Sequence, residues 1–280
     1  MKSLDNYIAD GEYGKRGYLK ENYRVFNIKD SRGGDFAFHY HEFDKIVLFI
    51  AGSVTYIVEG REYVLKPYDI LLVRHGDIHK PIIDSSTEYE RIVIWLDNGF
   101  LKTNHALDSC FDVAVGSSRL LRLSGEKRAK IFSVAREFIG DGESEFANDL
   151  MRDTLLLQLL ILINRAVTDE SEAVDFVSDS RIDSVIDYIN ANLLSELSVE
   201  KIAKEFFISR YYLMHRFKEL TGKTVLSYIQ SKRLLRAAAL LGKGCSAKEA
   251  CYKSGYRDYS VFLKAFKKEF DITPTEYKRQ

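Results

Sequence analysis

Three histidines in the first third of the chain are the residues best suited to chemistry. His39 and His41 are two positions apart, so on a β-strand their side chains lie on the same face. His79 follows a predicted turn at Gly76-Asp77. Neutral imidazoles can bind a divalent metal ion or form hydrogen bonds to a small polar ligand. These residues are therefore the first candidates for a metal or ligand site.

Short β-strands separated by turns must position the histidines, because residues 23–96 alternate between β-rich runs and turn signals. The runs are Phe36–His41, Lys45–Ile50, Val54–Val58, Ile70–Val73 and Tyr89–Trp95. Strands at this spacing predict an antiparallel sandwich or barrel whose interior is lined by every second side chain. A tight hairpin is expected at Glu59-Gly60, since glycine readily takes a positive φ.

The order of these residues resembles the cupin barrel in its ligand-sensing form. The matching features are His39-x-His41, Gly52, the run Leu65–Val73 and His79-Lys-Pro81. The resemblance implies that a metal site would need a carboxylate four residues after the second histidine, where this chain has Lys45. A protonated lysine cannot ligate a metal ion and is repelled by it. We therefore expect no metal and no cofactor.

Two interpretations of this polar group remain open. The histidines and Lys45 either line a pocket for a sugar or an anionic metabolite, or they are satisfied polar groups near the barrel mouth. Arg91 and Trp95 share one face of their strand. If that face is inward, they offer a cation and a stacking plane to a ligand; otherwise Trp95 is core and Arg91 is a charge at the rim. The candidate ligand-binding residues are His39, His41, Lys45, His79, Arg91 and Trp95.

Helices are predicted after residue 116, where the hydrophobic period changes from two to about 3.6. Ser124 is a possible N-cap of the first helix. The second, over residues 146–166, is apolar nearly all round in its C-terminal half. Such a helix must be covered on more than one side. We therefore predict a homodimer through residues 124–166, with purely intramolecular packing as the alternative.

A helical unit is used twice in the C-terminal part of the chain. Phe217-Lys218 returns as Phe266-Lys267, Thr224 as Thr273 and Tyr228 as Tyr277, each 49 residues later, and Phe207 is answered by Gly255 after 48. Such self-similarity indicates a duplicated supersecondary unit. Each copy is predicted to contain a short helix, a turn and a second helix. The expected N-caps are Ser198, Ser209, Ser246, Asp258 and Thr273.

The second helix of each copy is predicted to present a polar and basic face. The outward residues are Arg210, Tyr211, Met214, His215 and Lys218 in the first copy, and Tyr259, Ser260, Leu263, Lys264 and Lys267 in the second. A short helix, a turn and a helix of this kind is the arrangement that enters a DNA major groove. We expect the three lysines to contact phosphates, and the tyrosines, Met214, His215, Ser260 and Leu263 to lie near base edges.

The same segment resembles the AraC/XylS family of transcription regulators. The resemblance rests on Ile202-Ala203, Ser209, Leu213, Phe217-Lys218 and Gly222, and above all on Gly255-Tyr256, Asp258, Ser260, Phe262, Phe266-Lys267, Thr273-Pro274 and Tyr277. It implies two helix-turn-helix units joined by one linker helix, with RNA polymerase as a partner of an activator. Resemblance to sugar-responsive members favours a carbohydrate effector. Phe207 and Asp271 depart from the family pattern, which commonly has a small residue or glycine there.

The charge distribution favours a chain whose C-terminal part binds a polyanion. Residues 181–280 carry 19 Lys+Arg and 11 Asp+Glu, a balance of +8, so residues 1–180 carry −8 in a chain of zero net charge. No signal peptide or membrane span is recognisable, and the three cysteines lack metal-ligand spacing. We expect a cytoplasmic protein with reduced thiols.

The predicted fold class is multidomain α+β. A cupin-like antiparallel β-barrel with a helical pair spans residues 1–166, an acidic linker spans 167–180, and an all-α domain of two helix-turn-helix units spans 181–280. We predict a sequence-specific transcription regulator, not an enzyme, that binds double-stranded DNA and a small-molecule effector. A cupin metalloenzyme with a DNA-binding tail and a ligand-independent regulator with an empty barrel are the alternatives.

Overall fold

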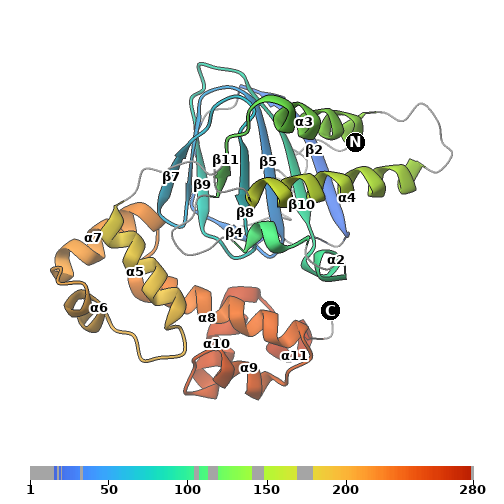
Figure 1. Ribbon diagram of the computed structural model, residues 1–280. Coiled ribbons are helices and arrows are strands. Elements are labelled where there is room, and N and C mark those ends of the chain that lie inside the picture. The colour runs from blue at the N-terminus through green and yellow to red at the C-terminus, as the bar shows by residue number, and fades with distance from the viewer. Residues whose placement is uncertain are drawn as a thin grey trace. The chain divides into compact units, whose positions relative to one another are not determined.

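The computed structural model describes residues 16–17, 19, 21–31, 34–103, 107–112, 119–140, 148–168 and 179–278. The chain divides into two compact units, Met1–Val177 and Ser178–Gln280. Figure 1 shows that the first is rich in strands and the second is helical. The predicted multidomain α+β fold is confirmed. Most of the predicted linker, residues 169–178, lies outside the described residues.

The first unit contains two antiparallel sheets that face each other. The five-stranded sheet has the order β11 (Leu120–Leu121), β8 (Ile70–Val73), β5 (Asp44–Ala51), β10 (Tyr89–Leu96) and β2 (Tyr23–Asp30). The four-stranded sheet has the order β3 (Gly34–Asp35), β9 (His79–Ile83), β6 (Val54–Val58) and β7 (Arg61–Val64). A short parallel pair joins β1 (Arg16–Gly17) to β4 (Tyr40–His41).

Strand alternation gives the five-stranded sheet two buried faces. Ile46 and Leu48 of β5 join a core shared with helices of this unit, together with Ile92 of β10. Val47 and Phe49 point the other way and pack against residues of β6, β7 and β9. Successive side chains of a strand point to opposite faces. The odd-numbered positions of β5 and β10 therefore lie between the two sheets.

Helices cover the outer face of the five-stranded sheet. Figure 1 shows α3 (Gly125–Ile139) and α4 (Asn148–Val167) lying side by side across it. Between β10 and α3 lie α2 (Asn98–Thr103) and the 3-10 turn η1 (Ser109–Phe111). Ser124 occupies the predicted N-cap position of α3, but its side chain makes no capping hydrogen bond. No helix among the described residues has both the length and the apolar character that crossing a membrane requires.

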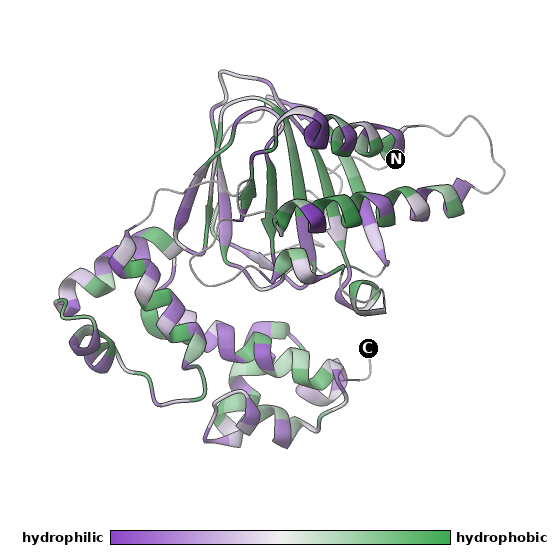
Figure 2. Ribbon diagram, in the orientation of Figure 1, coloured by the Kyte–Doolittle hydropathy of each residue, from purple (hydrophilic) through white to green (hydrophobic). Residues whose placement is uncertain are grey.

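Helix α4 is apolar on two sides, and Figure 2 shows hydrophobic colour along much of it. Its inner side is buried through Leu155, Leu156, Leu159, Leu160 and Ile163. Its outer side still carries large exposed apolar side chains, Leu150 at 68%, Met151 at 57% and Ile161 at 41% exposure. The first two residues of the predicted helix, Phe146 and Ala147, lie outside the described residues.

The predicted hairpin at Glu59-Gly60 is confirmed. Residues of β6 and β7 pair in antiparallel register on either side of it. Glu59 has φ 50° and Gly60 has φ 81°, the two positive values that a tight hairpin turn requires. The Glu59 carboxylate accepts a hydrogen bond from the backbone N–H of Ile78, so this buried charge has a partner.

The strand predicted at Phe36–His41 is wrong in its first half. Only Tyr40–His41 forms a strand, and His39 makes a single bridge to His79. The His39 ring nitrogen Nδ1 lies 2.9 Å from the carbonyl oxygen of Ala37. The Ala37 carbonyl is thus bonded to a side chain and not to another strand.

The second unit consists of helices with predicted caps in place. The helices are α5 (Ser180–Ala191), α6 (Val199–Glu205), α7 (Arg210–Thr221), α8 (Val225–Gly242), α9 (Ala247–Lys253), α10 (Tyr259–Phe270) and α11 (Pro274–Tyr277). The five predicted N-caps each accept a hydrogen bond from the backbone N–H three residues further on. Ser246 and Thr273 also form capping boxes with Glu249 and Glu276.

The sequence repeat is reproduced as a repeated contact. Phe217 meets Tyr228 edge to face, with ring centroids 5.3 Å apart and an interplanar angle of 86°. Its counterpart Phe266 meets Tyr277 at 5.6 Å and 88°. In both copies this aromatic pair joins the second helix to the element that follows it. Gly222 and its counterpart Asp271 both end their helices with a left-handed residue, at φ 69° and φ 60°.

The turns within the two copies differ in what surrounds them. Gly255 has φ 95°, and a Cβ atom there would lie 2.4 Å from the carbonyl oxygen of Leu193 and 3.0 Å from Nε of Arg233. Arg233 of α8 donates to the carbonyl oxygens of Leu193 and Ser195. The second turn is therefore packed against the loop before α6. Phe207, at φ 53°, is 96% exposed, so its turn has room for any side chain.

Replacing Gly255 by Ala should destabilise the protein by at least about 2 kcal/mol, because the new methyl group meets a backbone oxygen and left-handed alanine is strained. Gly242→Ala is the matched control: its Cβ meets nothing within 4 Å, so it should be neutral or stabilise by about 0.5 to 1 kcal/mol. Urea unfolding of both variants measures the difference. Equal free energies of unfolding would contradict the close approach.

Candidate functional site

A hydrogen bond between the two sheets marks the interior of the first unit. Lys45 of β5 and His79 of β9 are buried, and Lys45 Nζ lies 3.0 Å from His79 Nε2. The other ring nitrogen of His79, Nδ1, lies 2.9 Å from the carbonyl oxygen of Asp77. A carbonyl only accepts, so Nδ1 carries the proton and Nε2 accepts from Lys45. The sequence placed both residues in one site but gave no indication that they touch.

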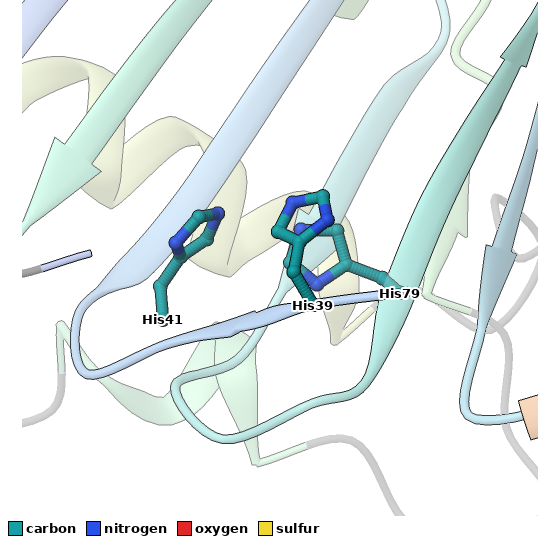
Figure 3. A group of neighbouring side chains, drawn as sticks. All are labelled: His39, His41 and His79. Atoms are coloured by element: carbon teal, nitrogen blue, oxygen red, sulfur yellow. The ribbon is translucent and has the colours of Figure 1, made fainter. Parts of the chain in front are cut away.

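The three predicted histidines lie close to one another (Figure 3). The His39 and His79 rings are 4.4 Å apart, and the His41 ring lies 5.0 Å from His39 and 5.1 Å from His79. One nitrogen from each ring lies within 4.8 Å of the others. His41 differs from its neighbours, because its buried Nδ1 atom has no hydrogen-bond partner among the described residues.

Three convergent imidazoles could hold a transition metal, but Lys45 opposes this. The His79 lone pair that would face a metal already accepts from Lys45 Nζ. A metal ion would have to displace this amine and tolerate its charge at close range. The chemistry of the donor set therefore favours a ligand that accepts hydrogen bonds over a cation.

Burial sets the protonation of this cluster. It lowers the pKa of Lys45 to about 7, and the positive charge of Arg91 adds to the effect. Burial, and then the charge of Lys45, lowers the pKa of His39 to about 4. The pKa values of His41 and His79 lie well below the usual range for the same two reasons in the same order. The imidazoles are therefore neutral at physiological pH, while Lys45, with a pKa of about 7, is part protonated and part neutral.

Arg91 and Trp95 both point between the sheets. Trp95 stacks on Phe43 at 4.5 Å between ring centroids and lies 6.0 Å from the His41 ring. It is thus part of an aromatic wall beside the histidines. Arg91 is buried rather than at an exposed rim: it pairs with Asp30 at 2.9 Å and lies over the Tyr89 ring at 3.9 Å. His39, His41, His79 and Trp95 therefore lie in one cluster with Lys45. Arg91 is instead engaged by Asp30 and Tyr89.

Helix α7 presents its predicted polar face to solvent. Arg210, Tyr211, Met214, His215 and Lys218 are all exposed, while Leu213 and Phe217 are buried on the opposite side. The rings of Tyr211 and His215 lie 3.9 Å apart, and His215 Nδ1 lies 2.9 Å from the Tyr211 carbonyl oxygen. This pairing fixes two of the side chains expected near base edges.

Helix α10 agrees with its prediction in part. Ser260, Lys264 and Lys267 are exposed, as expected. Tyr259 and Leu263 are only half-exposed, because both pack against the core of the second copy. The sequence interpretation missed Val261, an exposed apolar residue at 57% exposure on the same helix. Val261 directly precedes Phe262, which was predicted to face inward, and this position indicates that Val261 faces outward. Its methyl groups suit contact with the methyl group of thymine.

An anchor at the start of the second unit was also missed. Asp179 accepts hydrogen bonds from the Tyr212 hydroxyl at 2.6 Å and from Arg216 Nε at 3.0 Å. It also caps α5 by accepting from the backbone N–H of Arg181. Tyr212 and Arg216 belong to α7, so Asp179, near the end of the predicted linker, is fixed to that helix. Such a long-range cluster leaves no local sequence pattern.

Known protein families match both the strand-rich unit and the helical unit. A family model described as an AraC-like ligand binding domain matches residues 27–160, and one described as a helix-turn-helix domain matches residues 202–280. The chain belongs to the AraC/XylS family. It is therefore a DNA-binding transcription regulator with an N-terminal ligand-binding domain, and the predicted resemblance is confirmed.

Curated AraC-type relatives match over most of their length. The HTH-type transcriptional activator RhaR of Mannheimia succiniciproducens is 25% identical over 251 residues, covering 87% of each chain. The activator RhaS of Escherichia coli is 24% identical over 261 residues, covering 88% of each. A crystal structure of fatty-acid-bound ToxT from Vibrio cholerae aligns with 17% identity and a TM-score of 0.41, covering 93% of this chain and 97% of that one.

Lys45→Met should flatten the pH dependence of stability between about pH 7 and pH 10. The unfolded chain holds the Lys45 proton in this window and the folded chain releases it, so wild-type stability rises with pH, by at most about 1.4 kcal/mol per pH unit from one group. The rise is complete above the unfolded pKa. Chemical denaturation at several pH values measures the slope, and identical slopes in both proteins would refute a neutralised Lys45.

Lys267→Ala should weaken binding to all DNA sequences and reduce the slope of log K against log salt by about one. Replacing His215 by Ala should instead change the preference at particular bases by about 1 to 3 kcal/mol. Lys66→Ala, an exposed lysine of the first unit, is the control for loss of one positive charge. Salt-titrated binding measures all three; unchanged behaviour of the Lys267 and His215 variants would remove α7 and α10 from the DNA interface.

Proposed function

We propose that this chain is a transcription activator controlled by a small polar ligand, and that the ligand is a carbohydrate or a related polyhydroxy compound. The observation that carries the proposal is the cluster of His39, His41, His79 and Lys45 between the sheets, beside Trp95. Ligand sites combine an apolar or aromatic lining with a few convergent polar groups. Both relatives are named transcriptional activators, which supports activation of transcription over repression.

The proposed mechanism is a shift between arrangements of the two units. The ligand changes the activity of the DNA-binding unit only if it binds one arrangement better than another. The proposed DNA contacts are the exposed residues of α7 and α10 named above, with Val261 added. RNA polymerase is the proposed further partner.

Genome-wide mapping of bound sites tests this function with the full chain. We expect a limited set of sites upstream of genes, and a reporter driven by one such site that responds to one member of a panel of sugars and sugar derivatives. The same compound should raise the melting temperature of the purified protein, since a ligand that binds only the folded state stabilises it. A reporter that is fully active without any compound would favour a ligand-independent regulator.

A metalloenzyme remains the second candidate, because three histidine nitrogens lie within 4.8 Å of one another. Metal analysis of the purified protein distinguishes the two. Stoichiometric iron, manganese or zinc would support the enzyme, whereas metal-free protein that responds to a small molecule supports the regulator.

We also propose that two chains associate through the helical pair of residues 124–166. The support is the apolar outer side of α4, where Leu150, Leu157 and Ile161 recur at intervals of seven and four residues on one face. Leu150 and Ile161 are exposed and Leu157 is half-exposed in the single chain. A second copy would cover this stripe.

Changing Leu150 and Ile161 together to Glu should convert a dimer into a monomer, because charged side chains are not tolerated in an apolar interface. Gln158→Glu adds a charge at another exposed position of α4 and is the control. Sedimentation equilibrium measures the mass of each protein. A double variant that stays dimeric would exclude this helix face, and a monomeric wild type would exclude the dimer.

A further inference from the structure

Lys45 is a buried amine with a neutral hydrogen-bond partner, whereas the buried Arg91 on the neighbouring strand pairs with a carboxylate. Lys45 is 7% exposed, and no carboxylate of the described residues forms an ion pair with it. Its hydrogen-bond partner is the neutral ring of His79. Burial without a counter-charge lowers the pKa of Lys45 to about 7, and an anion bound beside the amine would favour its protonated, charged form.

Three carboxylates of this unit are engaged by partners other than Lys45. Asp44, the neighbour of Lys45 in the chain, pairs with His75 at 2.9 Å. Asp77 pairs with Arg119 at 2.7 Å. Asp30 pairs with Arg91 at 2.9 Å. None of these three carboxylates forms an ion pair with Lys45, so the amine has the His79 ring as its hydrogen-bond partner.

A second unsatisfied group lies in the same place. The buried Nδ1 of His41 has no hydrogen-bond partner among the described residues. The His41 ring lies 5.1 Å from the ring of His79, which holds Lys45. A neutral imidazole can present Nδ1–H as a donor. An ammonium and an imidazole that both have donors to spare complement the oxygens of an anion.

The aromatic wall limits what kind of anion fits. Trp95 and Phe43 stack on each other, and Phe43 stacks on the His41 ring at 4.6 Å with an interplanar angle of 8°. These faces suit a small ring or carbon skeleton next to the anionic group. Inorganic phosphate or sulfate would use the donors but leave the aromatic faces without a contact.

We infer that the effector is a carboxylated polyhydroxy compound, a sugar acid, whose carboxylate binds between Lys45 and His41 while its carbon skeleton lies against Trp95. This inference rests on the proposed ligand-sensing function and narrows the class of ligand. The carboxylate supplies the missing counter-charge and accepts a hydrogen bond from each unsatisfied group. A neutral sugar offers hydroxyl oxygens as acceptors but not the counter-charge.

Trp95 makes the test direct, because it is the only tryptophan of the 280-residue chain. The full-length protein is titrated with three matched pairs, glucose and glucuronate, galactose and galacturonate, and mannose and mannuronate, with gluconate, phosphate and sulfate alongside. Tryptophan fluorescence reports occupancy next to His41. We expect at least one acid to bind about 10- to 100-fold tighter than its neutral partner, the difference that a hydrogen bond to a charged group makes.

Three variants assign that preference to Lys45. Lys45→Met removes the charge at similar volume and should reduce the acid preference to within about twofold, whereas Lys45→Arg should keep most of it. Lys66→Met, at an exposed lysine of the same unit, should behave as wild type. Circular dichroism and melting temperature confirm that each variant is folded before it is titrated.

The outcomes separate this inference from the proposed function. Neutral sugars that bind as tightly as their acids would overturn the sugar acid while leaving carbohydrate sensing intact. An acid preference that survives in Lys45→Met would overturn the role of Lys45. A panel in which no acid alters the fluorescence, or in which phosphate and sulfate bind as tightly as any sugar acid, would overturn the inference as well.

Discussion

Both faces of the five-stranded sheet are buried, and the organisation of the first unit follows from this. The even-numbered side chains of β5 and β10 pack against α3 and α4, so the odd-numbered ones must lie between the sheets. Lys45 and Trp95 are odd-numbered and have no route to solvent on the helical side. The same alternation that builds the core therefore forces a lysine into the interior, where β9 brings His79 to meet it.

Burial of Lys45 between the two sheets has consequences for its protonation. Folded proteins rarely keep an uncompensated ammonium, since desolvation costs more than one hydrogen bond to a neutral ring returns. In this protein the consequence is a lysine whose pKa falls to about 7 and histidines that stay neutral. The cluster is poorly suited to a cation and well suited to hydrogen-bond acceptors. This property connects the fold of the sensor unit to the class of ligand it can recognise.

The DNA-binding unit shows how a duplicated sequence can give two unequal copies. The aromatic pair that holds each copy together is nearly identical in distance and angle. The turns are not equivalent, because Gly255 lies against the carbonyl oxygen of Leu193, whereas Phe207 faces solvent. The linker-helix residue Arg233 completes the contact on one side only. Glycine is thus required in the second turn by packing, and the first turn is free to carry a large side chain at a modest conformational cost.

Local patterns in the sequence predicted the strands β5, β6, β8 and β10, the caps of the second unit and its duplicated helices, because each depends on neighbours within a few residues. The two-residue spacing put His39 and His41 together, and the resemblance to the cupin barrel added His79 and Lys45. Only the tertiary structure decided which groups meet: the bond from Lys45 to His79, the pairing of Arg91 with Asp30 and the anchor at Asp179 join residues 33 to 61 positions apart. Such contacts follow from how sheets and helices pack, and packing distances leave no periodic signal in the chain.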